Sequence, residues 1–101
     1  MRFPSSTEVR ELVYTPSLRL NNGYFWWRLG MRGISIQDVD QALGNGTIIG
    51  RVKRIMRVLV QGHTSAGRTL NVVLAVHRAP GGGWWLDAVT AYWLSGKRKA
   101  S

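Results

Sequence analysis

Arginine dominates the chemistry that this sequence could perform. The chain carries 14 Lys and Arg against 5 Asp and Glu, a net charge of +9 at pH 7. Guanidinium groups bind phosphate through paired N–H donors, and a strongly basic chain attracts anionic partners. The candidates are RNA, DNA, an acidic protein and an anionic membrane surface. Arg28 and Arg32 stand four residues apart on a predicted helix, one turn from each other, where something anionic would relieve their repulsion.

A second group of cations surrounds the middle of the chain. Its members are Arg51, Lys53, Arg54, Arg57 and Arg68. Strand alternation places Lys53, Arg57 and Gln61 on the same face as Ile55 and Leu59, which is unusual unless that face borders a groove. A groove that holds Arg28, Arg32 and Arg57 would suit a nucleic-acid backbone. The alternative is a solvated sheet edge, where charges discourage aggregation.

Acid–base and metal chemistry have fewer candidates. Asp38 and Asp40 lie two residues apart on a predicted helix, and Asp87 stands alone, so no carboxylate pair is expected. His63 and His77 belong to different elements, and neither has metal-ligand spacing. We therefore predict no metal site and no cofactor. His63, in a Gly-flanked loop, is a candidate general acid or base near neutral pH, although an ordinary loop histidine is the alternative.

The aromatic residues have two interpretations, core packing or base stacking. Tyr24, Trp27 and Met31 follow at i, i+3 and i+7, which predicts that they face the core. Neighbours in a strand face opposite sides, so one of Trp84 and Trp85 is expected to be buried. Trp26 and the other of that pair could be exposed and stack on bases.

The elements that position these residues follow an α+β pattern. We predict helices at about 24–31 and 36–43, joined at Gly33, with Ser35 as the N-cap of the second. The period then changes to two, which predicts strands at about 47–52, 54–61, 68–77 and 84–94. Short loops favour an antiparallel meander with the helical pair on one face. Residues 1–20, an arm or a strand, join this single basic domain of residues 1–95, and residues 96–101 form a basic flexible tail.

The cellular compartment is predicted from three features that the sequence lacks: cysteine, a long apolar run and a signal-like start. The chain has no cysteine, which excludes a disulfide scaffold and a thiolate zinc site. No apolar run has the length of a membrane span, and the first residues lack the apolar stretch of a secretory signal. The expectation is a soluble cytoplasmic domain with no membrane partner.

Four segments in order resemble a family of small bacterial proteins, domain of unknown function 4258. They are residues 28–46 (RLGMRGISIQDVDQALGNG), 57–62 (RVLVQG), 68–76 (RTLNVVLAV) and 89–92 (VTAY). The resemblance covers about residues 24–93. It implies the fold of the RelE and BrnT toxins, with helices followed by a curved antiparallel sheet of about four strands.

The resemblance also implies a function, a metal-independent ribonuclease toxin neutralised by an acidic antitoxin or immunity protein, with the ribosome as a further partner. Family members usually carry a histidine where this chain has Tyr24. Arg28 and Arg57 would bind the phosphate, Thr90 would orient it, Tyr24 or Tyr92 would move a proton or stack on a base, and His63 is the reserve base. One alternative is a non-catalytic module that binds nucleic acid or the ribosome through the same groove. Another is a basic domain with an acidic protein partner.

Overall fold

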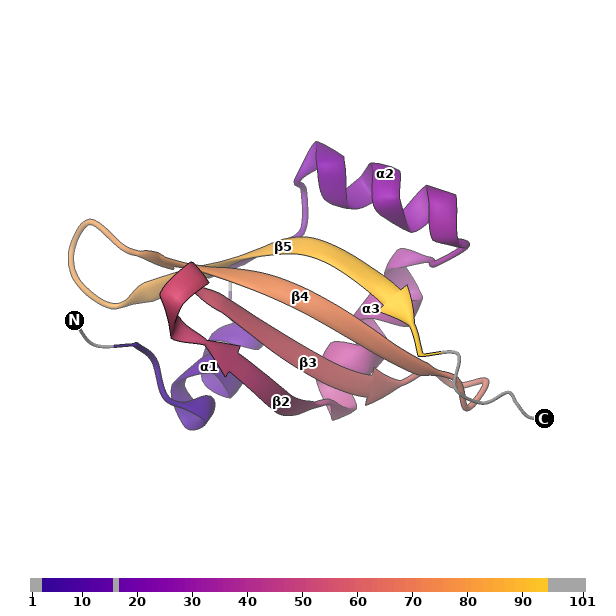
Figure 1. Cartoon of the computed structure of the whole chain (residues 1–101), viewed down its shortest axis with the longest axis horizontal. Helices are drawn as coiled ribbons and strands as arrows, with labels where there is room; N and C mark the ends of the chain where they lie inside the picture. The colour runs from indigo at the N-terminus through magenta and orange to yellow at the C-terminus, as the bar shows by residue number, and fades with distance from the viewer. Residues whose placement is uncertain (1–2, 16, 95–101) are drawn as a thin grey trace.

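A curved mixed sheet forms the centre of the computed structural model, which describes residues 3–15 and 17–94 (Figure 1). In this part of the chain the sheet has five strands in the order β1-β5-β4-β3-β2. The strands are β1 (Leu18–Arg19), β2 (Thr47–Val52), β3 (Arg57–His63), β4 (Thr69–Arg78) and β5 (Trp84–Trp93). The strands from β2 to β5 pair antiparallel, whereas β1 pairs parallel with β5. The basic tail predicted at residues 96–101 lies outside the described residues.

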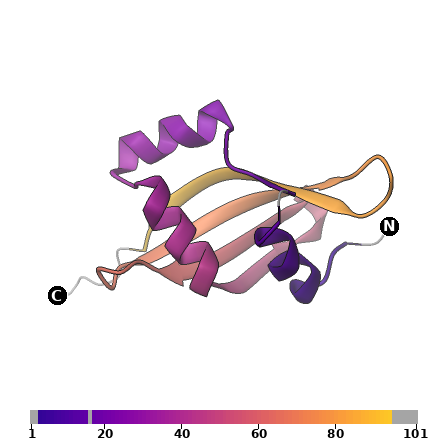
Figure 2. The ribbon, with the colours of Figure 1, turned by 180° about the vertical axis from the view of Figure 1, so that it is seen from behind.

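The described residues form three α-helices: α1 (Ser6–Val13), α2 (Gly23–Arg32) and α3 (Ile36–Asn45). Figure 2 shows α1 and α3 on one face of the sheet, while α2 runs along its edge beside β5. The opposite face, seen in Figure 1, carries no helix and is called the open face below.

The helix starts have local causes. Ser5 and Ser35 each accept a hydrogen bond from the backbone N–H three residues on, and an acidic side chain there completes a capping box. Gly33 ends α2 with φ 64°, a left-handed conformation that glycine adopts without strain.

The core lies between the sheet and the helices. Its fully buried members include Val9 of α1, Phe25 of α2, Val39 of α3, and Leu74 and Leu86 of the sheet. Close approach of α3 to β3 depends on two glycines. A Cβ on Gly62 would meet the backbone of Ala42, and one on Gly46 would meet the same carbonyl and the Val60 side chain. These contacts bring α3 nearer to the sheet than a larger residue would allow.

The α+β prediction is confirmed, and its details are partly wrong. The helices predicted at about 24–31 and 36–43 are present as α2 and α3, but they do not form a pair on one face, because α2 lies beside β5 while α3 packs on β3 and β4. Helix α1 and the two-residue β1 were not predicted, and β1 makes the sheet five-stranded and mixed rather than antiparallel with about four strands. The strand predicted from residue 54 begins only at Arg57, because residues Lys53–Ile55 form a 3₁₀ turn that Met56 ends with φ 55°. The turn removes Lys53 and Ile55 from the predicted strand face, whereas Arg57, Leu59 and Gln61 do share the open face.

The face of α2 was predicted wrongly. Phe25 and Leu29 are its buried residues, whereas Tyr24, Trp27 and Met31 are exposed. The helix carries apolar side chains nearly all round, so periodicity alone does not fix which face is inward. The contacts between its two ends and β5, given below, decide it.

A β-bulge in β5 determines which side chains reach the open face. Val73 pairs with Thr90, but its neighbour Leu74 pairs with Ala88, so Val89 has no partner of its own. The extra residue shifts the alternation of the strand by one. As a result Thr90 and Tyr92 lie on the open face with Asp87, while Ala91 is buried.

Candidate nucleic-acid interface at the edge of the sheet

Hydrogen bonds at both ends hold α2 against β5. At its start, Asn22 Nδ2 donates to Asp87 Oδ2 (3.2 Å). At its end, Arg32 Nη1 donates to Thr90 Oγ1 (3.2 Å) and to the carbonyl of Ala91 (2.9 Å). The indole N–H of Trp93 donates to the carbonyl of Arg32 (3.0 Å). These bonds fix the rotation of α2 and carry Arg32 over the strand edge toward the open face.

Asn22→Ala is expected to destabilise the fold by about 1–2 kcal/mol, because the same side chain caps α2 and bonds Asp87. Urea unfolding followed by circular dichroism measures the change. Asn21→Ala is the matched control, since the described contacts include no side-chain bond of Asn21. Equal stability of the two variants would show that the Asn22 contacts do not hold the helix.

We call the line of contact between α2 and β5 the seam, and it brings together five of the predicted site residues. Tyr24, Arg28 and Arg32 follow one another at four-residue spacing along α2, and Thr90 and Tyr92 lie on the adjoining strand. The Arg28 guanidinium carbon lies 5.8 Å from the Tyr24 ring centre, and that of Arg32 lies 6.0 Å from the Tyr92 ring centre. Each arginine is therefore paired with an aromatic ring, the arrangement found where proteins bind single-stranded nucleic acid.

The seam lacks neutralising charge. Arg28 Nε is buried and has no hydrogen-bond partner, and within residues 3–15 and 17–94 neither arginine forms an ion pair with a carboxylate. An unsatisfied donor on a charged group costs free energy when it is buried. An anion beside the Arg28 and Arg32 guanidinium groups would supply the missing charge.

Arg57 shares the open face with the seam but lies apart from it. Its Nη1 donates to the carbonyls of Ile55 (3.0 Å) and Met56 (3.2 Å), which draws the guanidinium toward the 3₁₀ turn. Strand β4 separates Arg57 from Thr90, a backbone distance of about 10 Å across the sheet and about 7 Å along it. The structure therefore does not bring the three arginines of the predicted groove together. Arg28 and Arg32 lie at the seam, and Arg57 lies farther across the same face of the sheet.

The other predicted cations lie in three places. Arg51 donates to the carbonyl of Pro4 (2.9 Å) and lies over the Phe3 ring, so it tethers the start of the chain. Lys53 and Arg54 are exposed in the 3₁₀ turn. Arg68 lies 3.8 Å from the Trp93 ring centre at the opposite end of the sheet.

Neither histidine reaches the seam. His63 ends β3, about 10 Å across the sheet and about 7 Å along it from Tyr92, and its backbone exchanges two hydrogen bonds with the Asn45 side chain. The His77 ring stacks on Trp85 at 4.2 Å, and Arg19 lies over the same indole at 5.0 Å. This row on the open face was not predicted as a unit, because the pairing of β1 with β5 creates it.

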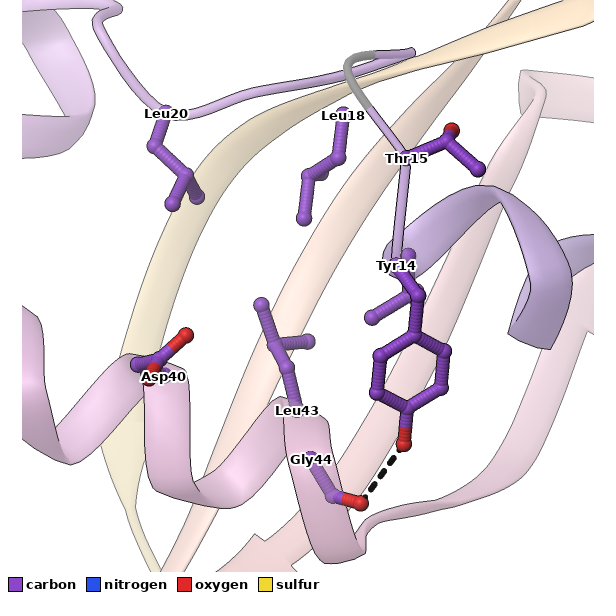
Figure 3. A pocket seen from close by; sticks show the side chains of 8 residues that line it. Tyr14, Thr15, Leu18, Leu20, Asp40, Leu43 and Gly44 are labelled. Carbon is purple, nitrogen blue, oxygen red and sulfur yellow. Dashed lines mark hydrogen bonds between the residues drawn. The ribbon is translucent and has the colours of Figure 1, made fainter.

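One pocket lies on the helix side of the sheet and holds none of the predicted site residues. Figure 3 shows it between the end of α1, the chain at Leu18 and Leu20, and α3. Its volume is about 160 Å³, and Tyr14 closes one side by donating to the carbonyl of Gly44 (2.7 Å). The lining is Val13, Tyr14, Thr15, Leu18, Leu20, Asp40, Leu43 and Gly44. Its one charged side chain is acidic, so it does not suit a phosphate.

Two further findings concern the described residues alone. They contain no group of three or more His, Cys, Asp or Glu side chains placed to hold a metal ion. Among their helices, none is long and apolar enough to cross a membrane.

Comparison of the chain with protein-family models, curated proteins and solved structures finds no match.

Proposed function

We propose that the protein is a metal-independent ribonuclease that binds RNA at the α2–β5 seam. The observation that carries this proposal is the pair Arg28 and Arg32, whose charges no carboxylate of the described residues neutralises. The Nε of Arg28 is buried without an acceptor, and each arginine lies beside a side chain that bears a hydroxyl group. A phosphodiester supplies an anion of suitable size, and arginine binds it through paired donors.

The reaction that suits these groups is transesterification. The ribose 2′-oxygen forms a new bond to phosphorus as its proton leaves, and the 5′-oxygen of the next nucleotide departs and takes up a proton. Arg28 and Arg32 would stabilise the extra negative charge of the pentacoordinate phosphorus. The hydroxyls of Tyr24 and Tyr92 are the candidates for moving the two protons, and Thr90 would orient Arg32. The need for a 2′-hydroxyl makes DNA a poor substrate.

The position of the histidines favours a second candidate, RNA binding without cleavage. Neither His63 nor His77 lies at the seam, so an imidazole base is missing there. A non-catalytic module would use the same arginines to hold RNA or a ribosomal RNA surface, and it would leave the RNA intact.

Incubation with total RNA in excess EDTA separates the two candidates. Cleavage by the wild type and not by Arg28→Ala is the result expected for the ribonuclease. Intact RNA, together with binding that weakens steeply as salt rises, is expected for the module. Intact RNA and no binding at low salt would contradict both, and would leave a basic domain whose partner is an acidic protein.

The proposed partners follow from the same charge. An acidic antitoxin or immunity protein would compete with RNA for Arg28 and Arg32, and action on RNA would take place in the cytoplasm. Arg57, Lys53, Arg54 and Arg68 would contribute to RNA attraction at longer range.

A further inference from the structure

The outward half of α2 is apolar and exposed. Tyr24, Trp26, Trp27 and Met31 show 52%, 47%, 57% and 62% of their surface to solvent. Gly30 lies among them, and Arg28 borders the cluster at Tyr24, on the side of the helix opposite Trp26. An exposed cluster of large apolar side chains marks an interaction site more often than an accident of packing.

One side of this cluster continues into the seam. The rings of Tyr24 and Trp27 lie 5.9 Å apart at 43°, and the Arg28 guanidinium lies over the Tyr24 ring. A row therefore runs from Arg28 through Tyr24 to Trp27. Trp26 points to the other side of the helix, about 100° from Trp27, and has no ring or cation contact within the described residues.

We propose that Trp27 is a stacking platform for an unpaired base of single-stranded RNA, next to a phosphate held by Arg28. The proposal rests on the proposed function and names its substrate class. A phosphate at Arg28 places the adjoining nucleotide beside Tyr24, and the exposed indole of Trp27 is the next flat surface along the row. A base inside a duplex is already stacked on its neighbours and cannot use such a platform.

Charge favours RNA over an apolar partner at this side of α2. An aromatic surface built for a protein or a lipid has no need of an unneutralised guanidinium over one of its rings. A cation next to aromatic rings, as in the Arg28–Tyr24–Trp27 row, can bind a phosphate and its neighbouring bases together. Trp26 provides the internal comparison, because it shares residue type, helix and exposure but lies outside the row and contacts no ring or cation in the described residues.

The test measures binding of a fluorescent single-stranded RNA, 2′-O-methylated so that it cannot be cleaved, by anisotropy at low salt. Trp27→Ala is expected to weaken binding by about 5- to 100-fold, and Trp26→Ala by less than about 2-fold. A blunt-ended duplex of the same composition, which has no unpaired base, is expected to bind all three proteins equally. Thermal unfolding confirms that both variants are folded, as their exposed side chains predict.

Each result decides the point. Equal losses in Trp26→Ala and Trp27→Ala, or an equal loss on the duplex, would overturn the platform and indicate a general apolar surface. If Arg28→Ala abolishes binding while Trp27→Ala does not change it, the platform fails and the RNA site stands. If Trp27→Ala selectively weakens binding but native RNA is never cut, the platform stands and the ribonuclease proposal fails.

Discussion

Arg28→Ala is expected to lower the rate of RNA cleavage by about 100- to 1,000-fold, because it removes a preorganised positive donor from the proposed phosphate site. The Arg28 side chain makes no hydrogen bond within the described protein, so the substitution removes no native hydrogen bond. Cleavage of a fluorogenic RNA in EDTA measures the effect. Arg28→Lys keeps the charge but loses the paired donors, and it is expected to recover only part of the activity.

Arg54→Ala is the matched control for this prediction. It removes the same charge from an exposed position in the 3₁₀ turn, where only long-range attraction of RNA is lost, and it is expected to change cleavage by less than about 3-fold. The slope of log affinity against log salt should fall by about 0.7 for Arg28→Ala, as for one lost phosphate contact on a single strand. Equal effects of the two substitutions would mean that net charge, rather than the seam, governs RNA binding.

Gly62→Ala is expected to destabilise the fold by about 3 kcal/mol or more, because the added methyl group would meet the backbone of α3 at Ala42. Backbone cannot rotate away as a side chain can, so α3 would have to move off the sheet. For a domain of this size, the midpoint of thermal unfolding should fall by more than about 12 °C. Differential scanning calorimetry measures both quantities.

Gly30→Ala is the matched control, because it adds the same methyl group at a position where space for it is free. No atom lies within 4 Å of the place that its methyl group would take, and alanine is the better helix former, so a gain of up to about 1 kcal/mol is expected. A stable Gly62→Ala protein with a native spectrum would show that α3 and β3 do not pack as closely as the structure indicates.

The parts of the fold that were predictable are those with local causes. The N-cap at Ser35, the stop at Gly33 and the alternation of β3 and β4 each depend on residues within a few positions. Several site residues were identifiable for a similar reason, because four-residue spacing on a helix places Tyr24, Arg28 and Arg32 on one side whatever the helix packs against.

The parts that could not be predicted depend on distant contacts. The rotation of α2 is set by Asp87, Thr90 and Trp93, about sixty residues farther along the chain, so Trp27 could not be placed from periodicity. Strand β1 is two residues long and exists through its pairing with β5. The remoteness of Arg57 from the seam likewise follows from the packing of α2 beside β5 rather than over β3.

The β-bulge at Val89 gives β5 one residue that it can lose without turning over its faces. Leu74 pairs with Ala88 and Val73 with Thr90, so the two sides of the bulge are already in register across Val89. Loss of Val89 would place Thr90 directly after Ala88 in a regular ladder, with both hydroxyls still on the open face and Ala91 still buried. A further loss of one residue, from a ladder that no longer holds a spare, would invert every side chain on one side of the gap.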